Sequence, residues 1–319
     1  MRNTGYRQEK RENMTKVVKR ELNGLSSISN SEGIFSIVAM DQRNTLKRMF
    51  AAVGVTATDE DMFQAKIAVA SALSKAASGI LLDPTWGVPA VNENDILPKS
   101  CGLLIAAENP DRGNFNGEPR PTKLAGQDAA WVKSLGGQAV KVLVSMHPGR
   151  AIKAGEPDLT SETVELVRSI VADCKEQGIP SVIENLIYPM PNSEPLDDEQ
   201  KENLIVESAI LLNETKPDLL KLEFPITERG CKRLANSLTV PWAVLSAGVA
   251  FDQFKKAITI SCDAGGASGF IAGRSIWKEA IGMNKVEQEK FLNSTAVARL
   301  EELNQTVVGR AVPWQKAIK

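Results

Sequence analysis

The stretch 139–187 decides the fold, because it reads as a strand, a helix and a second strand in succession. It opens with AVKVLV at 139–144 and ends with SVIENLI at 181–187, both short, apolar and rich in β-branched residues. Between them, residues 160–177 (TSETVELVRSIVADCKEQ) place apolar residues at helical spacing. Runs that are apolar on both faces are typical of buried parallel strands, so the stretch predicts a strand–helix–strand unit.

The same pattern extends in both directions along the chain. Six further runs have this character, at 34–40, 79–82, 102–106, 219–224, 242–245 and 268–272. Helix-like stretches separate them at 45–53, 59–77, 126–135, 198–213, 228–237 and 251–264, and a helical tail runs from about 275 to 304. Eight strands alternating with helices over about 250 residues predict an α/β fold, the (β/α)8 TIM barrel. The alternative is a doubly wound open sheet, but the chain has no glycine-rich nucleotide-binding motif.

The composition is ordinary and its charges are balanced. The chain has 319 residues, with 38 lysine and arginine against 39 aspartate and glutamate, which leaves a formal charge of −1. This balance disfavours a strongly basic nucleic-acid binder, and we expect no nucleic-acid partner. Residues 1–30 are predicted to form a polar extension and 31–319 a single domain; a nucleic-acid arm is the less favoured interpretation of 1–22. The longest irregular piece is 108–123.

Counts of single residue types narrow the chemistry. His147 is the one histidine, which excludes a zinc site built on three histidines. The four cysteines are far apart and include no Cys-x-x-Cys pair, so we expect buried, reduced thiols in a cytoplasmic protein. No apolar run approaches the length of a membrane span, and we expect no membrane partner.

Charged residues interrupt three successive predicted strands. Lys141, Glu184 and Lys221 each lie within an apolar run. A buried lysine is costly unless it is paired or serves a chemical purpose. Side chains alternate between the two faces of a strand, so these groups converge near the barrel axis if their faces point inward. A structural lysine–glutamate pair, or lysines that face solvent, is the alternative interpretation.

This constellation suits Schiff-base chemistry, in which a neutral lysine attacks a ketone. Desolvation and a nearby cation both favour the neutral amine, and Lys141 is placed to supply that cation for Lys221. Glu184 is expected to move protons during dehydration and carbon–carbon cleavage. Because the protonated imine is the electron sink for a retro-aldol reaction, we expect neither a metal nor a cofactor.

The last two predicted strands end in glycine-containing turns. Ser246 and Gly248 follow the seventh strand, and Gly273 and Arg274 follow the eighth. In this fold the chemistry lies at the carboxyl ends of the strands, and phosphate is commonly bound after the last two, through backbone N–H groups and a helix N-terminus. Tight turns with an arginine at the surface are the alternative.

Seven short motifs, taken in order, make the chain similar to a known family. They are AMDQR (39–43), ILLDP (80–84), AVKVL (139–143), IE (183–184), LKLEFP (220–225), LSAGV (245–249) and AGRSIW (272–277). Together they resemble the class I tagatose-1,6-bisphosphate aldolase family, which includes the related sulfofructosephosphate aldolase. The resemblance covers roughly residues 33–282.

The resemblance implies an aldehyde lyase that reversibly cleaves a ketose phosphate into dihydroxyacetone phosphate and a three-carbon aldehyde. The ketose is tagatose 1,6-bisphosphate, giving glyceraldehyde 3-phosphate, or 6-deoxy-6-sulfofructose 1-phosphate, giving sulfolactaldehyde. It also implies Lys221 as the Schiff-base lysine, Glu184 as the acid and base, and Lys141 as their electrostatic neighbour. Asp41 and Gln42 match the motif that lies near the substrate hydroxyls, and the two glycine-containing turns match the loops that hold the phosphate of dihydroxyacetone phosphate.

Asp83 and Arg43 complete the predicted substrate contacts. Asp83 ends the second strand, where capping of the following helix is the alternative role. The segments after the fourth and fifth strands match neither family type, so the anion at the aldehyde end of the substrate stays open between phosphate and sulfonate. Arg43, Lys47 and Arg150 are the candidate cations for it.

Two further functions stay open at this stage. A sugar-phosphate isomerase or epimerase keeps the phosphate loops without an imine. A non-catalytic sugar-phosphate sensor uses residues 1–22 as its contact surface. In the preferred interpretation the protein is a homo-oligomer that acts on a small-molecule sugar phosphate in the cytoplasm.

Overall fold

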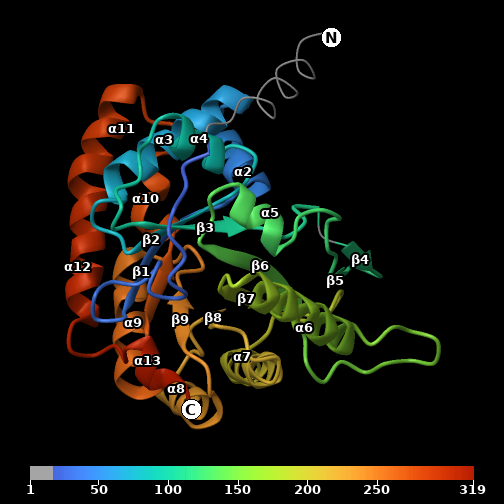
Figure 1. Cartoon of the computed structure of the whole chain (residues 1–319). Helices are drawn as coiled ribbons and strands as arrows, with labels where there is room; N and C mark the ends of the chain where they lie inside the picture. Colours follow the sequence, from blue (N-terminus) through green and yellow to red (C-terminus); the bar gives the residue numbers. More distant parts are fainter. Residues whose placement is uncertain (1–16, 112) are drawn as a thin grey trace.

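The computed structural model describes residues 17–111 and 113–319 of the chain. Parallel strands close into a barrel in the order β1-β2-β3-β6-β7-β8-β9-β10, with β10 paired to β1 (Figure 1). They are β1 (Phe35–Met40), β2 (Gly79–Leu82), β3 (Gly102–Ala106), β6 (Ala139–Met146), β7 (Ser181–Ile187), β8 (Leu219–Leu222), β9 (Trp242–Leu245) and β10 (Gly269–Ala272). All eight predicted strands are confirmed to within two residues at each end. Closure of the sheet confirms the (β/α)8 fold and excludes the open-sheet alternative.

Helices follow the strands and form the outer ring (Figure 1). The predicted ones are found as α2 (Asn44–Ala52), α3 (Asp59–Leu73), α5 (Ala129–Ser134), α6 (Leu159–Gln177), α7 (Asp198–Asn213), α8 (Glu228–Ser237) and α9 (Phe251–Gly265). The predicted helical tail is divided into α10 (Arg274–Trp277), a 3-10 turn η1 (Lys278–Ala280), α11 (Lys285–Phe291), a π-helical turn η2 (Leu292–Ala296) and α12 (Val297–Val307). Helices α11 and α12 run along one side of the barrel, where α12 packs against α9 and α3 (Figure 1).

Capping side chains set the start of most ring helices. Thr58 before α3 and Asp197 before α7 each form a capping box, and Asp158 caps α6. The two helices that follow the last strands differ. The residues before α9 and α10, Ala250 and Gly273, make no side-chain cap, so no capping side chain takes up the first N–H groups of these helices.

Two apolar layers flank the barrel wall. One lies between strands and helices, and the other fills the barrel interior with residues such as Ala139, Val182 and Leu219. Each of these three stands two positions before a charged residue on the same strand. Because strand side chains alternate between faces, the lower interior is apolar and the level above it carries charge.

The N-terminal segment closes the lower end of the barrel. Leu25 and Ile28 join the interior apolar cluster, and Ser78, just before β2, donates from Oγ to the carbonyl of Ile28 at 2.9 Å. Within the predicted extension 1–30, residues 17–30 therefore pack against the barrel. Residues 1–16 lie outside the described part of the chain.

Two short helices and one hairpin were not predicted. Helix α4 (Gly87–Glu93) follows β2, and α13 (Trp314–Ala317) lies near the C-terminus. The piece predicted to be irregular, 108–123, contains an antiparallel hairpin of β4 (Gly113–Phe115) and β5 (Glu118–Arg120). Its turn is Asn116-Gly117, and both residues have positive φ, the geometry that suits a two-residue hairpin.

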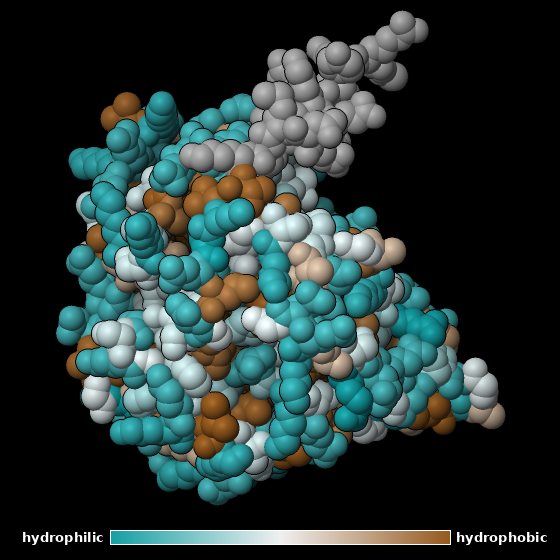
Figure 2. All heavy atoms as spheres, viewed as in Figure 1, coloured by the Kyte–Doolittle hydropathy of each residue, from teal (hydrophilic) through white to brown (hydrophobic). Residues whose placement is uncertain are grey.

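The face drawn in Figure 2 is mainly hydrophilic, with hydrophobic residues in small, separate groups. The four cysteines are free and buried, as predicted. Among the described residues, no helix combines the length and apolar character that crossing a membrane requires.

Candidate active site

Three charged side chains meet inside the barrel, near the carboxyl ends of its strands. Lys141 of β6, Glu184 of β7 and Lys221 of β8 all face the interior. Glu184 Oε2 lies 2.7 Å from Lys141 Nζ and 2.8 Å from Lys221 Nζ. Only 1% of Lys141, 8% of Glu184 and 4% of Lys221 is exposed. The structure thus brings together, out of bulk water, the three groups that the strand pattern singled out.

Lys141 is also bound by two further carboxylates. Its Nζ lies 2.8 Å from Asp41 Oδ2 and 3.1 Å from Glu108 Oε1. The other oxygen of Glu108 accepts the backbone N–H of Leu143, and Oε1 also contacts the Arg43 guanidinium at 3.3 Å. Sequence reasoning missed Glu108, although it stands two positions after an interior alanine of β3, as Asp41 does on β1.

Opposite charges outweigh burial in this ion cluster. Burial alone raises the pKa of a carboxylic acid, but the ammonium groups of Lys141 and Lys221 hold the pKa of Asp41 and that of Glu184 below their usual range. Burial alone lowers the pKa of a lysine, but Asp41, Glu108 and Glu184 together raise the pKa of Lys141. Lys141 therefore stays a cation and the two acids stay carboxylates at neutral pH.

Asp83 occupies a different place from the other predicted site residues. It is fully buried, and its Oδ1 lies 2.7 Å from the equally buried ammonium of Lys66 on α3. Its Oδ2 accepts two backbone N–H groups at the turn into α4, as a capping carboxylate does. Lys66 also donates to the carbonyls of Met40 and Gln42. The Lys66–Asp83 pair therefore holds the backbone on both sides of Asp41.

Gln42 turns its side chain toward the last strand. Its Oε1 is buried and accepts no hydrogen bond from the described residues. A Cβ added to Gly273 would come within 3.4 Å of Gln42 Nε2. A buried acceptor without a donor is uncommon, which makes this amide a candidate to bind a ligand.

The turns after β9 and β10 lie against each other. Gly273 N–H points to Ser246 Oγ at 3.4 Å, and a Cβ on Gly248 would lie 3.0 Å from Arg274 Cζ. Gly248 has φ +83, which also favours glycine. Lys278 donates to the carbonyl of Gly248 at 3.3 Å and adds a second cation that the sequence had not suggested. With the two uncapped helix starts, this corner is suited to an anion.

The three cations predicted to bind the anion at the far end of the substrate have different contacts in the structure. Arg43 is paired with Glu108, as described above. The Arg150 side chain is 4% exposed and binds Glu118 of the β4–β5 hairpin at 2.9 Å. Lys47 lies over the Trp86 ring, 5.0 Å from its centroid, and forms no ion pair with the described residues.

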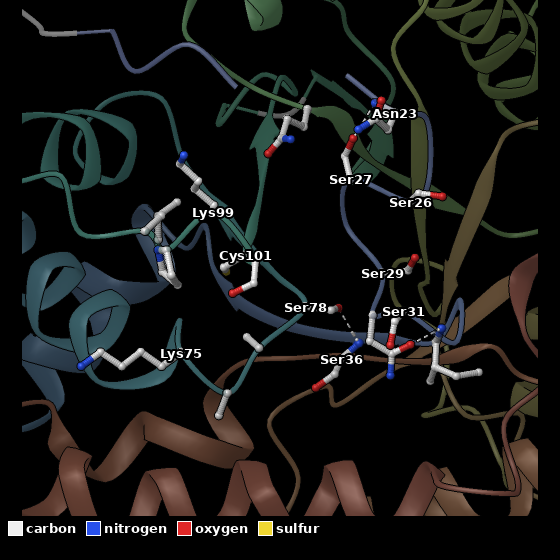
Figure 3. Close-up of a pocket in the computed structure, with 18 of the residues that line it drawn as sticks. Asn23, Ser26, Ser27, Ser29, Ser31, Ser36, Lys75, Ser78, Lys99 and Cys101 are labelled. Atoms are coloured by element: carbon white, nitrogen blue, oxygen red, sulfur yellow. Dashed lines mark hydrogen bonds between the residues drawn. The ribbon is translucent and has the colours of Figure 1, made fainter. Parts of the chain in front are cut away.

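A large hollow lies at the lower end of the barrel, opposite the ion cluster. Figure 3 shows residues that line this hollow. Its volume is about 1240 Å³, and Ser36, Ser78 and Cys101, at or just before the starts of β1, β2 and β3, line it. Four basic and three acidic residues surround it, so its charge is nearly balanced. Helices α3 and α12 end there, and helix C-termini disfavour anions. The chemistry of the lysines and the phosphate-type turns belongs to the other end.

The match to a known family now decides the protein's class. A model of the DeoC/LacD family aldolases matches residues 35–279. The chain belongs to this family. As a DeoC/LacD aldolase it is a lyase, which confirms the predicted enzyme class and leaves the isomerase and sensor alternatives without support.

Curated relatives agree with this assignment. Tagatose 1,6-diphosphate aldolase of Staphylococcus haemolyticus is 28% identical, over 93% of this chain and 98% of the relative. The enzyme of the same name from Staphylococcus aureus is 28% identical, over 92% and 96%. These matches confirm the predicted family resemblance.

Solved structures show the same fold at lower identity. Fructose-bisphosphate aldolase from Plasmodium falciparum superposes with a TM-score of 0.70 at 16% identity, covering 93% of this chain and 99% of that one. An archaeal fructose-1,6-bisphosphate aldolase, whose catalytic lysine is covalently bound to the carbinolamine intermediate, gives 0.52 at 17% identity, covering 86% and 96%. At these identities the likeness shows the barrel fold alone.

Proposed function

We propose that this DeoC/LacD aldolase cleaves a ketose phosphate through an imine on Lys221, releasing dihydroxyacetone phosphate and a three-carbon aldehyde. The observation that carries the proposal is the Lys221 amine, buried inside the barrel with a carboxylate at 2.8 Å. Attack on a ketone requires a deprotonated amine, and Glu184 is placed to accept that proton.

The substrate is oriented by its phosphate. The turns holding Ser246, Gly248, Gly273 and Arg274 seat the phosphate on C1, next to β8, which carries Lys221. Backbone N–H groups and the Arg274 guanidinium are the donors. This places C2, the ketone carbon, at the lysine amine.

Glu184 then transfers the protons that imine formation requires. Its carboxylate takes the proton from Lys221, returns a proton to the carbinolamine oxygen and so lets water leave. The C2=N bond forms as the C2–O bond breaks, and the protonated imine draws the electron pair of the C3–C4 bond. Lys141, with its raised pKa, stays a cation beside Glu184 throughout and fixes the position of that carboxylate.

Asp41 and Gln42 are proposed to bind the substrate hydroxyls. Asp41 forms an ion pair with Lys141. The side-chain amide oxygen of Gln42 is buried and accepts no hydrogen bond from the described residues. Asp83 is proposed to act indirectly, by holding Asp41 in position. It pairs with Lys66, which donates to the backbone carbonyls on both sides of Asp41.

We propose tagatose 1,6-bisphosphate as the substrate, since the relatives that match over most of the chain are named for it. Of the three cations predicted for the anion at the far end of the substrate, Arg150 and Arg43 are engaged by carboxylates. Lys47 has no such partner among the described residues and is the proposed contact. Comparing kcat/KM for tagatose 1,6-bisphosphate, fructose 1,6-bisphosphate and sulfofructose 1-phosphate tests this choice.

Borohydride trapping tests the imine. The full-length protein is reduced with sodium borohydride in the presence of dihydroxyacetone phosphate, and we expect a stable adduct on the peptide that contains Lys221. Lys221→Met should lose both adduct and cleavage, whereas Lys255→Met, which removes an exposed lysine on α9, should keep both. A chelator should leave cleavage unchanged. An adduct at another lysine, or full activity of Lys221→Met, would contradict the proposal.

A further inference from the structure

One carboxylate near the proposed site is used by none of these steps. Glu223 directly follows β8, two positions beyond Lys221, so both side chains stand on the interior face. Two residues along a strand span about 6.6 Å, which sets Glu223 one level closer to the open end of the barrel. Its Oε2 accepts the backbone N–H of Ile187, at the end of β7, at 2.8 Å.

Glu223 differs from Glu184 in its partners. Glu184 Oε2 is held between two ammonium groups, at 2.7 and 2.8 Å. Glu223 forms no ion pair with the described residues, and its Oε1 accepts no hydrogen bond from them. It is half-buried, so one oxygen is fixed by the β7 backbone and the other is left to reach a ligand.

The charges around Glu223 favour a proton carrier at neutral pH. The pKa of Glu223 is raised to about 7, mainly by burial; the hydrogen bond from Ile187 opposes the rise, and the nearby carboxylate of Glu184 adds to it. Lys221 is the charged group on its own strand, and β9 on the other side (WAVL) carries none. An acid–base group works best with a pKa near the working pH, and the pKa of Glu223 lies there.

The proposed binding mode places the reacting hydroxyl at this level. The C1 phosphate lies at the turns after β9 and β10, and C2 is bonded to Lys221. The remaining carbons then extend away from those turns, toward the open ends of β8 and β7, where Glu223 and Ile187 stand.

We propose that Glu223 is the acid–base residue for the C4 hydroxyl of the ketose, while Glu184 serves the imine. This inference rests on the proposed function. In cleavage the O4–H proton moves to Glu223, the O–H electron pair forms the C4=O bond, the C3–C4 bond breaks, and its electron pair enters the protonated imine to give the enamine. In condensation Glu223 returns the proton to the aldehyde oxygen as the C3–C4 bond forms.

Glu223→Gln separates this role from imine formation. The glutamine amide oxygen still accepts the Ile187 N–H, so the change removes the ionisable group and keeps the backbone contact. Two reactions are measured on the full chain: ketose cleavage, and exchange of a C3 proton of dihydroxyacetone phosphate with deuterium from solvent. Exchange needs the imine and the enamine but no C4 hydroxyl.

We expect cleavage by Glu223→Gln to fall by about 100-fold or more, in kcat and not in KM, with exchange kept to within about threefold. In the unchanged protein, cleavage should decline as pH falls below about 7, because Glu223 must be ionised to accept the proton; the variant should lose this decline. Glu223→Asp should recover part of the rate, and Glu228→Gln, an exposed carboxylate at the start of α8, should change nothing.

The two proposals fail in different ways. A fall in cleavage of less than about 30-fold, or an equal loss of cleavage and exchange, would overturn the role of Glu223. Absence of exchange and of a borohydride adduct in the unchanged protein would overturn the imine itself.

Discussion

Replacing Lys141 by methionine removes the cation that three carboxylates share inside the barrel. Asp41, Glu108 and Glu184 lie 2.8, 3.1 and 2.7 Å from its Nζ. With side chains at most 12% exposed, solvent screens these contacts little. Breaking a buried ion pair from one side costs about 3–5 kcal/mol, because the partner is left charged and unpaired. We therefore expect the free energy of unfolding to fall by about 3–5 kcal/mol at pH 8.

The loss should depend on pH in a defined direction. Lys141 holds the pKa of Asp41 and of Glu184 in the folded protein below their values in the unfolded chain. Its contribution to the free energy of unfolding is therefore fully present above the unfolded pKa values, and it is lost as pH falls through the folded pKa values. Without Lys141 both acids bind protons at higher pH in the folded state. The difference between the two proteins should therefore shrink between pH 8 and pH 5.

Urea unfolding at the two pH values measures this difference, with equal slopes required before midpoints are compared. Lys255→Met is the matched control, since its partner Glu302 is exposed and such pairs contribute about 0–1 kcal/mol. If both variants unfold at the same urea concentration at pH 8, or if the Lys141 loss is the same at pH 5, the account of the ion cluster is refuted.

Two other substitutions probe the supports of the site. Lys66→Met strands the fully buried Asp83 and should lower the free energy of unfolding by about 3–5 kcal/mol, with kcat falling as Asp41 shifts; urea unfolding and steady-state kinetics at pH 8 check both. Gly248→Ala puts a Cβ 3.0 Å from Arg274 Cζ at a backbone φ of +83, so KM for the ketose phosphate should rise at least about tenfold while borohydride still labels Lys221 at saturating substrate. An unchanged KM would place the phosphate elsewhere.

Alternation along strands explains what was predictable. Apolar runs of four to eight residues separated by helical stretches fix both the number of strands and their inner faces. A charge inside such a run, as at Lys141 and Lys221, can then be placed from the sequence alone. The same rule applied to Ala106 would have found Glu108, which was missed because it opens a segment taken as irregular. The turn residues Asn116-Gly117 in that segment were a further local signal for the hairpin.

Other roles depend on partners far away in the chain. Asp83 stands where a strand-end carboxylate reaches substrate in this fold, yet Lys66 neutralises it from a helix. Arg43 and Arg150 have the charge for a distal phosphate, but Glu108 and Glu118 engage them. No local pattern announces such pairings, because each is fixed only when the barrel closes.

The ion cluster balances three basic residues against three acidic ones. The basic members are Lys141, Lys221 and Arg43, and the acidic members are Asp41, Glu108 and Glu184. A homologue that loses one residue of the cluster keeps an unbalanced charge inside the barrel until a residue of the opposite charge is lost as well. Homologous chains should therefore change these positions in couples, a basic residue together with an acidic one. Arg43 stands farthest from the reacting amine in this chain of contacts, and Glu108 is its partner, so these two form the couple that evolution can remove first.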